Sequence, residues 1–168
     1  MYLISKRIFD ILSSIIALVL FSPLIIIISI WIALDSRGGV FYRQIRVGKN
    51  QKEFGLFKFR SMRVNSDKAG QITIGNDSRV TNVGRFIRKF KIDEVPQLIN
   101  ILKGDMSVVG PRPEVPKYVA MYSPNQLKVL SVLPGLTDYA SIEYLDGQKI
   151  LGTADDPDRA YIDEVMPA

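Results

Sequence analysis

The chain has 168 residues, enough for one domain with its own hydrophobic core, and it carries a net charge of +5. It contains no cysteine and no histidine, which excludes disulfides, thiolate catalysis, His-dependent triads and zinc sites built on Cys or His. Any catalysis therefore depends on Asp, Glu, Lys, Arg, Tyr, Ser or Thr. Any metal is expected to be a hard, oxygen-ligated ion such as Mg²⁺.

The charge is distributed unevenly along the chain. Residues 1–92 contain 16 Lys and Arg against 5 Asp and Glu, a balance of +11, whereas residues 93–168 contain 6 against 12, a balance of −6. A basic half beside an apolar anchor favours anionic lipid head groups and anionic substrates. Nucleic acid is not expected as a partner, because the chain carries no nucleic-acid-binding motif.

An uncharged apolar segment lies near the N-terminus. It runs from Ile11 to Leu34, between Asp10 and Asp35. A helix of this length reaches about 36 Å, enough to cross a hydrocarbon core of about 30 Å. The run is too long for a removable signal peptide, and no small-residue cleavage site follows it. The segment therefore predicts a membrane-embedded helix.

Ser22 and Pro23 lie in the middle of this run, and proline is expected to bend or break the helix there. Two topologies remain open on the residues alone: a kinked helix that crosses the bilayer, and a helix-break-helix that enters and leaves by one face. Lys and Arg flank both ends, which mildly favours both ends inside. A re-entrant helix would need Ser13, Ser14 or Ser22 to satisfy freed carbonyls.

The segments after the apolar run predict a β-hairpin and short helices. The runs Val40–Val47 and Phe54–Met62 are β-rich, and Gly48–Lys52 between them is typical of a turn. Residues 63–82 are polar and are expected to form a surface loop. Gly84–Phe90 alternates apolar and basic residues at helical spacing, so its apolar side is expected to dock on the membrane or the core.

The adjacent carboxylates Asp93 and Glu94 open a predicted helix that runs from Glu94 to Lys103, with Asp93 as its N-cap and Gly104 just past its end. Asp93 is a good N-cap, and a capping role without chemistry is one interpretation. The other is catalytic: a carboxylate held among cations stays ionised as a nucleophile or metal ligand while the cations hold an anionic substrate. Asp105, just past the helix, is either a structural partner or a further metal ligand.

Several cations near this pair have two interpretations. Arg112 lies in a rigid Pro-Arg-Pro turn and is either a surface side chain or a phosphate clamp. Lys58 and Arg60 are predicted on one face of a strand, which is either a solvated basic face or part of a substrate site. The residues alone leave both questions open.

The motifs resemble, together and in this order, those of the small monotopic polyprenol-phosphate phosphoglycosyltransferases, the bacterial sugar transferase family. The resemblance covers roughly residues 1–137. Its motifs are Lys6–Asp10, Ser22–Pro23, Gln44–Gly48, Lys58–Met62, Gly84–Arg88, Asp93–Leu98, Gly104–Ser107, Gly110–Pro113 and Pro134–Thr137.

The resemblance implies an α+β protein with a re-entrant membrane helix-break-helix in residues 1–36, broken at Ser22 and Pro23. A small cytosolic catalytic domain of short helices with a β-hairpin then follows in residues 37–168. The implied location is the cytoplasmic face of a bacterial inner membrane. Members of the family usually continue further, so a terminal membrane-associated element is expected beyond residue 168. A homodimer is one oligomeric state that the sequence leaves open.

The resemblance also implies a reaction. Family members transfer a sugar phosphate from a UDP-sugar to polyprenol phosphate and release UMP, as the first membrane step of glycoconjugate biosynthesis. By analogy Asp93 is the nucleophile that forms an aspartyl phosphosugar, and Glu94, with Asp93, helps hold Mg²⁺. Lys58, Arg88 and Arg112 correspond to substrate-phosphate contacts.

The chain departs from the family pattern after Thr137, where Asp138–Ser141 replaces a more usual Gly-Trp-Ala-Gln and an acidic stretch follows. This departure leaves the identity of the sugar open. Two rival hypotheses remain. One is a non-catalytic, membrane-anchored basic binding module. The other is an enzyme in which Asp93 acts as a base in a single displacement.

Overall fold

The computed structural model describes residues 2–64, 66, 77–138 and 159. The loop predicted over 63–82 lies largely outside the described residues, as do the divergent stretch from residue 139 and the acidic tail. The described elements, in chain order, are α1 (Tyr2–Asp35), β1 (Phe41–Val47), η1 (Lys49–Gln51), β2 (Glu53–Phe59), α2 (Asn82–Lys89), η3 (Ile92–Glu94), α3 (Gln97–Lys103), β3 (Ser107–Val109), α4 (Pro116–Val119), η4 (Gln126–Ser131) and β4 (Gly135–Thr137).

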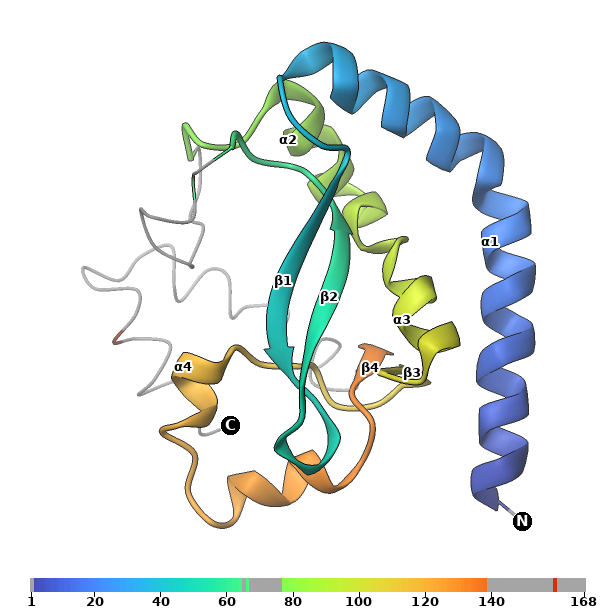
Figure 1. Cartoon of the computed structure of the whole chain (residues 1–168), viewed down its shortest axis with the longest axis vertical. Helices are drawn as coiled ribbons and strands as arrows, with labels where there is room; N and C mark the ends of the chain where they lie inside the picture. The colour runs from blue at the N-terminus through green and yellow to red at the C-terminus, as the bar shows by residue number, and fades with distance from the viewer. Residues whose placement is uncertain (1, 65, 67–76, 139–158, 160–168) are drawn as a thin grey trace.

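The helix α1 runs along one side of the other elements and bends over them (Figure 1). It is long and apolar enough to cross a membrane. It continues without interruption through Ser22 and Pro23, so the expected break is a bend within one helix. Pro23 has no N–H to donate to the carbonyl of Val19, and the Ser22 hydroxyl donates to that carbonyl instead, at 2.8 Å. This contact confirms that a serine satisfies the freed carbonyl.

The predicted hairpin is confirmed. β1 and β2 pair antiparallel, with Phe41 opposite Phe59 and Val47 opposite Glu53, and the 3-10 helix η1 forms the turn between them. β3 and β4 form a second, parallel pair. The mixed helices and strands agree with the expected α+β class.

Both arms of α1 contribute to the hydrophobic core. Ile28 and Ile32 of the second arm pack with Phe59, Val83 and Ile87, joining α1 to β2 and α2. Around the first arm, Ala17 and Leu18 pack against a second cluster formed by Phe54, Leu56, Leu98, Ile101 and Met106. The opposite side of α1 remains apolar and exposed, with Leu20 and Leu34 among the most accessible side chains.

The beginning of α3 differs from the prediction. Asp93 lies inside the 3-10 helix η3 and does not cap α3, whose N-cap is Pro96. The physical reason is Pro96, which has no N–H for the carbonyl of Ile92, so the N–H of Val95 takes that carbonyl at 3.1 Å and closes a 3-10 turn. The predicted end is confirmed, because Gly104 terminates α3 with a left-handed φ of 90°.

Candidate active site

Asp93 and Glu94 lie in η3, the turn that joins α2 to α3. Lys91, just before it, has a positive φ of 57° and a left-handed backbone conformation, which separates η3 from the end of α2. Asp93 is 6% exposed, and the Glu94 side chain is 16% exposed. A turn between two packed helices therefore holds both carboxylates in place.

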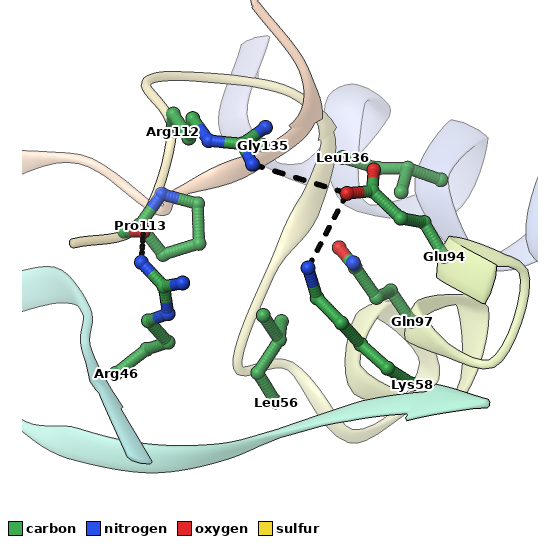
Figure 2. A pocket seen from close by; sticks show the side chains of 9 residues that line it. All are labelled: Arg46, Leu56, Lys58, Glu94, Gln97, Arg112, Pro113, Gly135 and Leu136. Carbon is green, nitrogen blue, oxygen red and sulfur yellow. Dashed lines mark hydrogen bonds and ion pairs between the residues drawn. The ribbon is translucent and has the colours of Figure 1, made fainter. Parts of the chain in front are cut away.

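Glu94 receives cations from two other parts of the chain. Its Oε1 atom lies 3.3 Å from Lys58 Nζ on β2 and 3.9 Å from an Arg112 guanidinium nitrogen (Figure 2). These three side chains border a pocket whose other lining residues are Arg46, Leu56, Gln97, Pro113, Gly135 and Leu136. The structure thus brings together Lys58, Glu94 and Arg112, three of the predicted site residues, at one pocket.

Asn100 positions β2, and with it Lys58, against the carboxylates. Its side chain is fully buried on α3. Its Oδ1 accepts from the backbone N–H of Phe57 at 2.9 Å, and its Nδ2 donates to the carbonyl of Gly55 at 2.9 Å. One amide therefore satisfies both backbone groups on either side of residue 56 and fixes the strand on the helix.

The turn that carries Arg112 is held from both sides. Arg46 of β1 donates to the carbonyl of Pro113 at 3.0 Å and pairs with Glu114 at 3.2 Å. On the other side, the N–H of Gly135 donates to the carbonyl of Pro111 at 2.8 Å. These contacts fix the backbone on each side of Arg112, so less conformational entropy would be lost if its guanidinium bound an anion.

Gly110 and Gly135 permit the hydrogen bond between the N–H of Gly135 and the carbonyl of Pro111. A Cβ atom on Gly135 would lie 2.2 Å from the backbone nitrogen of Gly110, and one on Gly110 would lie 2.4 Å from the carbonyl oxygen of Leu133. Real Cβ atoms do not approach that closely, so any side chain would separate the two segments. The glycines of the Gly-Pro-Arg-Pro and Pro-Gly-Leu-Thr motifs therefore have a shared packing role.

Burial changes the pKa values of Asp93 and Lys58 in opposite directions. Burial raises the pKa of the Asp93 carboxyl, and the charges of Lys58 and Arg88 oppose this effect only in part. Burial likewise lowers the pKa of Lys58, against the raising effect of Glu94. A carboxylate with a raised pKa is more basic and, by the usual Brønsted relation, a better nucleophile than an exposed one.

Two predicted basic residues lie elsewhere. Arg88 does not line the pocket, although its charge acts on Asp93. Arg60 is 7% exposed and donates to the carbonyls of Ser36, Arg37 and Gly39 at 2.6 to 2.8 Å, just past the C-terminal end of α1. The guanidinium thus satisfies backbone acceptors in the segment that follows α1, so Arg60 is structural and not part of a basic substrate face.

Asp105 is also structural. Its Oδ2 accepts from the Asn100 amide at 3.2 Å and lies 3.8 Å from Lys103 Nζ. These contacts are at the C-terminal end of α3, whereas Glu94 precedes its N-terminal end. Asp105 therefore supports Asn100, and the alternative role as a further metal ligand at this site has no support.

The donor set at Asp93 and Glu94 fits a magnesium ion that is shared with a substrate. Mg²⁺ is commonly held by one or two carboxylates together with substrate phosphates and water. Within the described part of the chain, no group of three or more acidic side chains forms a complete protein cage. Two adjacent carboxylates beside a cationic pocket suit a magnesium ion that is shared with substrate phosphates. They do not suit an ion that is ligated by the protein alone.

The sequence reasoning missed Arg46 and Gln97 as pocket residues. Both belong to motifs of the family resemblance, Gln44–Gly48 and Asp93–Leu98, but the sequence predicts no individual role for either residue. Gln97 is 4% exposed and faces the pocket from the first turn of α3, three residues after Glu94. A polar residue at that helical spacing from a candidate catalytic carboxylate was the available signal.

Several known proteins are similar to this chain in sequence. A UDP-N-acetylgalactosamine-undecaprenyl-phosphate N-acetylgalactosaminephosphotransferase of Aeromonas hydrophila is 45% identical over 145 residues, which are 84% of this chain and 34% of that protein. An undecaprenyl-phosphate glucose phosphotransferase of Komagataeibacter xylinus is 39% identical over 170 residues, covering 92% of this chain and 30% of that protein. The exopolysaccharide production protein ExoY of Rhizobium meliloti (strain 1021) is 40% identical over 149 residues, which are 79% of this chain and 66% of that protein.

The chain thus spans about a third of the length of the first two relatives. Their names specify different sugars, N-acetylgalactosamine and glucose. The model of the family described as bacterial sugar transferase matches residues 1–167. This match over nearly the whole sequence shows that the chain belongs to the bacterial sugar transferase family.

Proposed function

We propose that this protein transfers a sugar phosphate from a UDP-sugar to polyprenol phosphate and releases UMP, through a covalent intermediate on Asp93. The observation that carries the proposal is the pocket in which Lys58 and Arg112 converge on Glu94, next to the buried Asp93. Such a site offers a nucleophile and cations for phosphates without histidine or cysteine. The names of the relatives, which specify undecaprenyl-phosphate transferases, support the same reaction.

The reaction proceeds in two displacements. A carboxylate oxygen of Asp93 attacks the β-phosphorus of the UDP-sugar, and the bond to the bridging oxygen breaks, so that UMP leaves with that oxygen. The product is an acyl phosphate that joins Asp93 to the sugar phosphate. A phosphate oxygen of polyprenol phosphate then attacks the same phosphorus, and the Asp93 carboxylate leaves. Lys58 and Arg112 hold the anionic phosphates throughout, and Arg88 acts on Asp93 by its charge.

Glu94 and Asp93 would hold Mg²⁺ together with the substrate pyrophosphate. When bound, the ion neutralises charge on the pyrophosphate and on the departing UMP. Lys58 lies 3.3 Å from Glu94 Oε1, so it also keeps the Glu94 carboxylate oriented toward the pocket before substrate binds.

The test is UMP release from a panel of UDP-sugars by protein in nanodiscs, with undecaprenyl phosphate and Mg²⁺. We expect repeated turnover that depends on the acceptor, and with the acceptor omitted we expect release of about one UMP per protein together with a stoichiometric sugar-phosphate adduct on the peptide that contains Asp93. Release without any adduct would favour a single displacement with Asp93 as base. No release with any sugar, from a chain extended to the length of its relatives, would favour the non-catalytic binding module.

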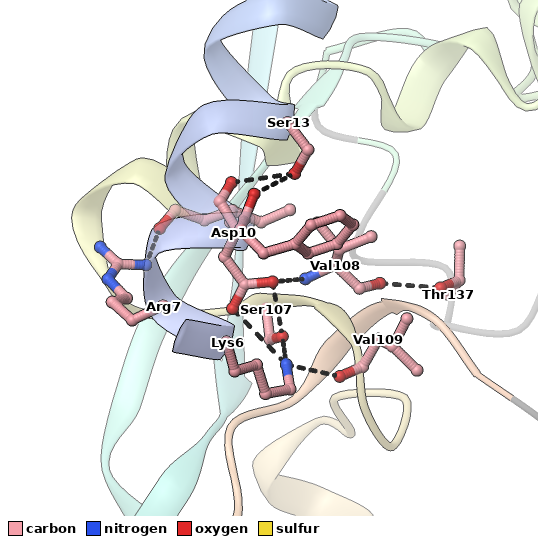
Figure 3. Close-up of polar contacts among 10 residues, drawn as sticks. Lys6, Arg7, Asp10, Ser13, Ser107, Val108, Val109 and Thr137 are labelled. Atoms are coloured by element: carbon pink, nitrogen blue, oxygen red, sulfur yellow. Dashed lines mark hydrogen bonds and ion pairs between the residues drawn. The ribbon is translucent and has the colours of Figure 1, made fainter. Parts of the chain in front are cut away.

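We also propose that α1 is re-entrant, so that both ends lie on the cytoplasmic face with the catalytic domain. At the start of α1, Asp10 accepts from Ser107 Oγ and from the N–H of Val108, each at 3.0 Å, and Arg7 donates to the carbonyl of Ile101 at 2.6 Å (Figure 3). At its end, Asp35 accepts from the N–H of Val83 in α2 at 3.3 Å.

These contacts support the re-entrant topology because they tie both ends of one helix to the same small domain. A straight helix of this length would separate its ends by about 51 Å, more than the thickness of a bilayer. The bend brings both arms onto one set of elements (Figure 1). A helix that crossed the membrane would have to break one of these two sets of contacts.

The topology can be tested with single cysteines, since the chain has none of its own. Ser5→Cys and Ser36→Cys place one thiol near each end of α1. In intact cells, both are expected to resist a membrane-impermeant maleimide and to react after the inner membrane is opened. Labelling of Ser5→Cys alone from the periplasm would overturn the re-entrant topology.

The pH dependence of UMP release is expected to be a narrow bell. Activity rises with pH as Asp93 deprotonates and falls as Lys58 deprotonates. Burial raises the pKa of Asp93 and lowers the pKa of Lys58, so both limbs move toward neutrality. Because arginine keeps its proton, Lys58→Arg should shift the alkaline limb to higher pH and leave the acid limb in place. An unmoved alkaline limb would show that another group sets it.

Arg46→Gln is expected to raise the KM for the UDP-sugar by about tenfold, because the turn that carries Arg112 loses a charged hydrogen bond and an ion pair. The measurement is the initial rate of UMP release against UDP-sugar concentration. Arg43→Gln is the matched control, since it removes an exposed cation from the same strand. Equal changes in KM for the two variants would indicate a general charge effect.

A further inference from the structure

We propose that α2 makes a second contact with the membrane, in which Phe86 and Phe90, together with Trp31 of α1, lie in the head-group layer of an anionic bilayer. We call these three side chains the aromatic patch. The proposal concerns a surface and its lipid partner, and it stands whether or not the chain transfers a sugar phosphate.

The aromatic patch is exposed and continuous. Trp31 is 43% exposed, Phe86 41% and Phe90 56%. The ring centroids of Trp31 and Phe86 are 5.4 Å apart, and those of Phe86 and Phe90 are 4.9 Å apart. Large aromatic rings that pack on one another in solvent retain much exposed apolar area, and such contiguous areas mark interaction sites.

The two sides of α2 explain why these rings face outward. Val83 and Ile87 are fully buried against α1 and β2 and hold the helix on the domain. Arg85 and Lys89 are exposed beside the aromatic patch, with Lys89 Nζ 5.6 Å from the Phe90 ring. Exposed aromatics flanked by basic side chains are the composition of a helix that lies in a membrane interface with anionic lipid.

The aromatic patch also continues the membrane surface of α1. Trp31 belongs to the second arm of that helix, next to the exposed side chains of Ile27, Ile30 and Leu34. Figure 1 shows α2 beside this arm. Tryptophan is enriched at the boundary between lipid and water, so Trp31 places the boundary at the level of α2. Because the aromatic patch adjoins the apolar surface of α1, we infer that lipid, and not a protein partner, covers it.

The contact has a consequence for the site. Phe90 caps the end of α2, and Asp93 follows it by three residues, through Lys91 with its left-handed backbone. An α2 that is fixed in the interface therefore fixes the height of Asp93 above the lipid. At that height the carboxylate would be near the level at which a lipid-linked phosphate lies.

The test uses the single tryptophan of the chain. In the full chain, Trp31→Phe combined with Phe90→Trp puts the only indole at position 90, where exposure allows the change. The protein is placed in nanodiscs of phosphatidylcholine and phosphatidylglycerol that carry bromine near the head group. The control is Trp31→Phe with Val132→Trp, because Val132 is 50% exposed and follows η4, which contacts the far, turn end of the hairpin.

We expect brominated lipid to quench the indole at position 90 at least about twofold more than the indole at position 132, and aqueous acrylamide to show the reverse order. Unmodified protein, with Trp31 in place, should also be quenched by the lipid, because Trp31 belongs to the aromatic patch. Equal quenching at positions 90 and 132 would overturn the proposal. Protection of position 90 from both quenchers would also overturn it and would point to a second copy as the occupant.

Discussion

Asp93→Asn is expected to reduce UMP release by at least about 10³-fold and to abolish the covalent adduct, because the amide is isosteric but not nucleophilic. The substitution keeps the volume of a side chain that is 6% exposed, so the pocket geometry should survive. The expected loss is therefore in kcat and not in the binding of the UDP-sugar. Single-turnover kinetics and equilibrium binding of the UDP-sugar separate these two effects.

The same substitution is expected to stabilise the folded protein at neutral pH. Burial raises the pKa of Asp93 in the folded state above its value in the unfolded chain. The folded state then binds the proton more tightly, so stability falls as pH rises through the window between the two pKa values, and the penalty is complete above the folded-state pKa. A neutral Asn avoids this penalty, and the gain should vanish at acidic pH.

The control for both measurements is Glu53→Gln, which neutralises an exposed carboxylate at the start of β2. It should leave activity and stability nearly unchanged. The measurement is thermal unfolding of wild type and both variants in nanodiscs at neutral and acidic pH. A less stable Asp93→Asn protein would mean that the attraction between Asp93 and Lys58 outweighs the cost of burying the carboxylate, and Asp93 would then be chiefly a structural ion-pair partner.

The features that sequence predicts well here depend on neighbours within a few residues. The hairpin follows from the turn residues 48–52, and the end of α3 follows from Gly104, because glycine adopts the left-handed conformation at low cost. Ser22 compensates for Pro23 within one helical turn. In each of these cases the interaction that decides the structure is local.

The features that sequence did not predict depend on distant partners. Arg60 resembles a substrate-binding cation until the structure brings the end of α1 to it, 21 to 24 residues earlier in the chain. Asn100 is an ordinary helical polar residue until β2 supplies the backbone groups that it satisfies. Arg46 reaches the Arg112 turn across 67 residues. No periodicity or turn rule encodes such pairings.

The candidate site could be predicted from the sequence only in part. The residues alone indicated a carboxylate pair with cations on both sides, but they could not separate a helix cap from a nucleophile. The cap is excluded because Asp93 lies within η3 and Pro96 begins α3. What remains is a buried carboxylate beside Lys58, whose placement costs folding free energy, and such costs are typical of functional sites.

Asp10→Ala is expected to destabilise the protein by about 3 kcal/mol and to release the first arm of α1 from the domain. Asp10 is 2% exposed and accepts from Ser107 Oγ and the N–H of Val108, and its Oδ2 lies 3.5 Å from Lys6 Nζ. Removing it leaves the buried Ser107 hydroxyl and the partly buried N–H of Val108 without this acceptor. The measurements are thermal unfolding in nanodiscs and the maleimide reactivity of Ser5→Cys after the membrane is opened.

Asp10→Asn provides the matched control, because its amide oxygen still accepts from Ser107 or Val108 while the attraction to Lys6 is lost. An intermediate loss of stability, smaller than for Asp10→Ala, is expected if hydrogen bonds to β3 carry most of the effect. Equal losses of stability for Asp10→Ala and Asp10→Asn would instead show that the ion pair with Lys6 causes the effect. If neither variant lost stability, the first arm of α1 would not be held by β3, and the strongest support for a re-entrant helix would disappear with that contact.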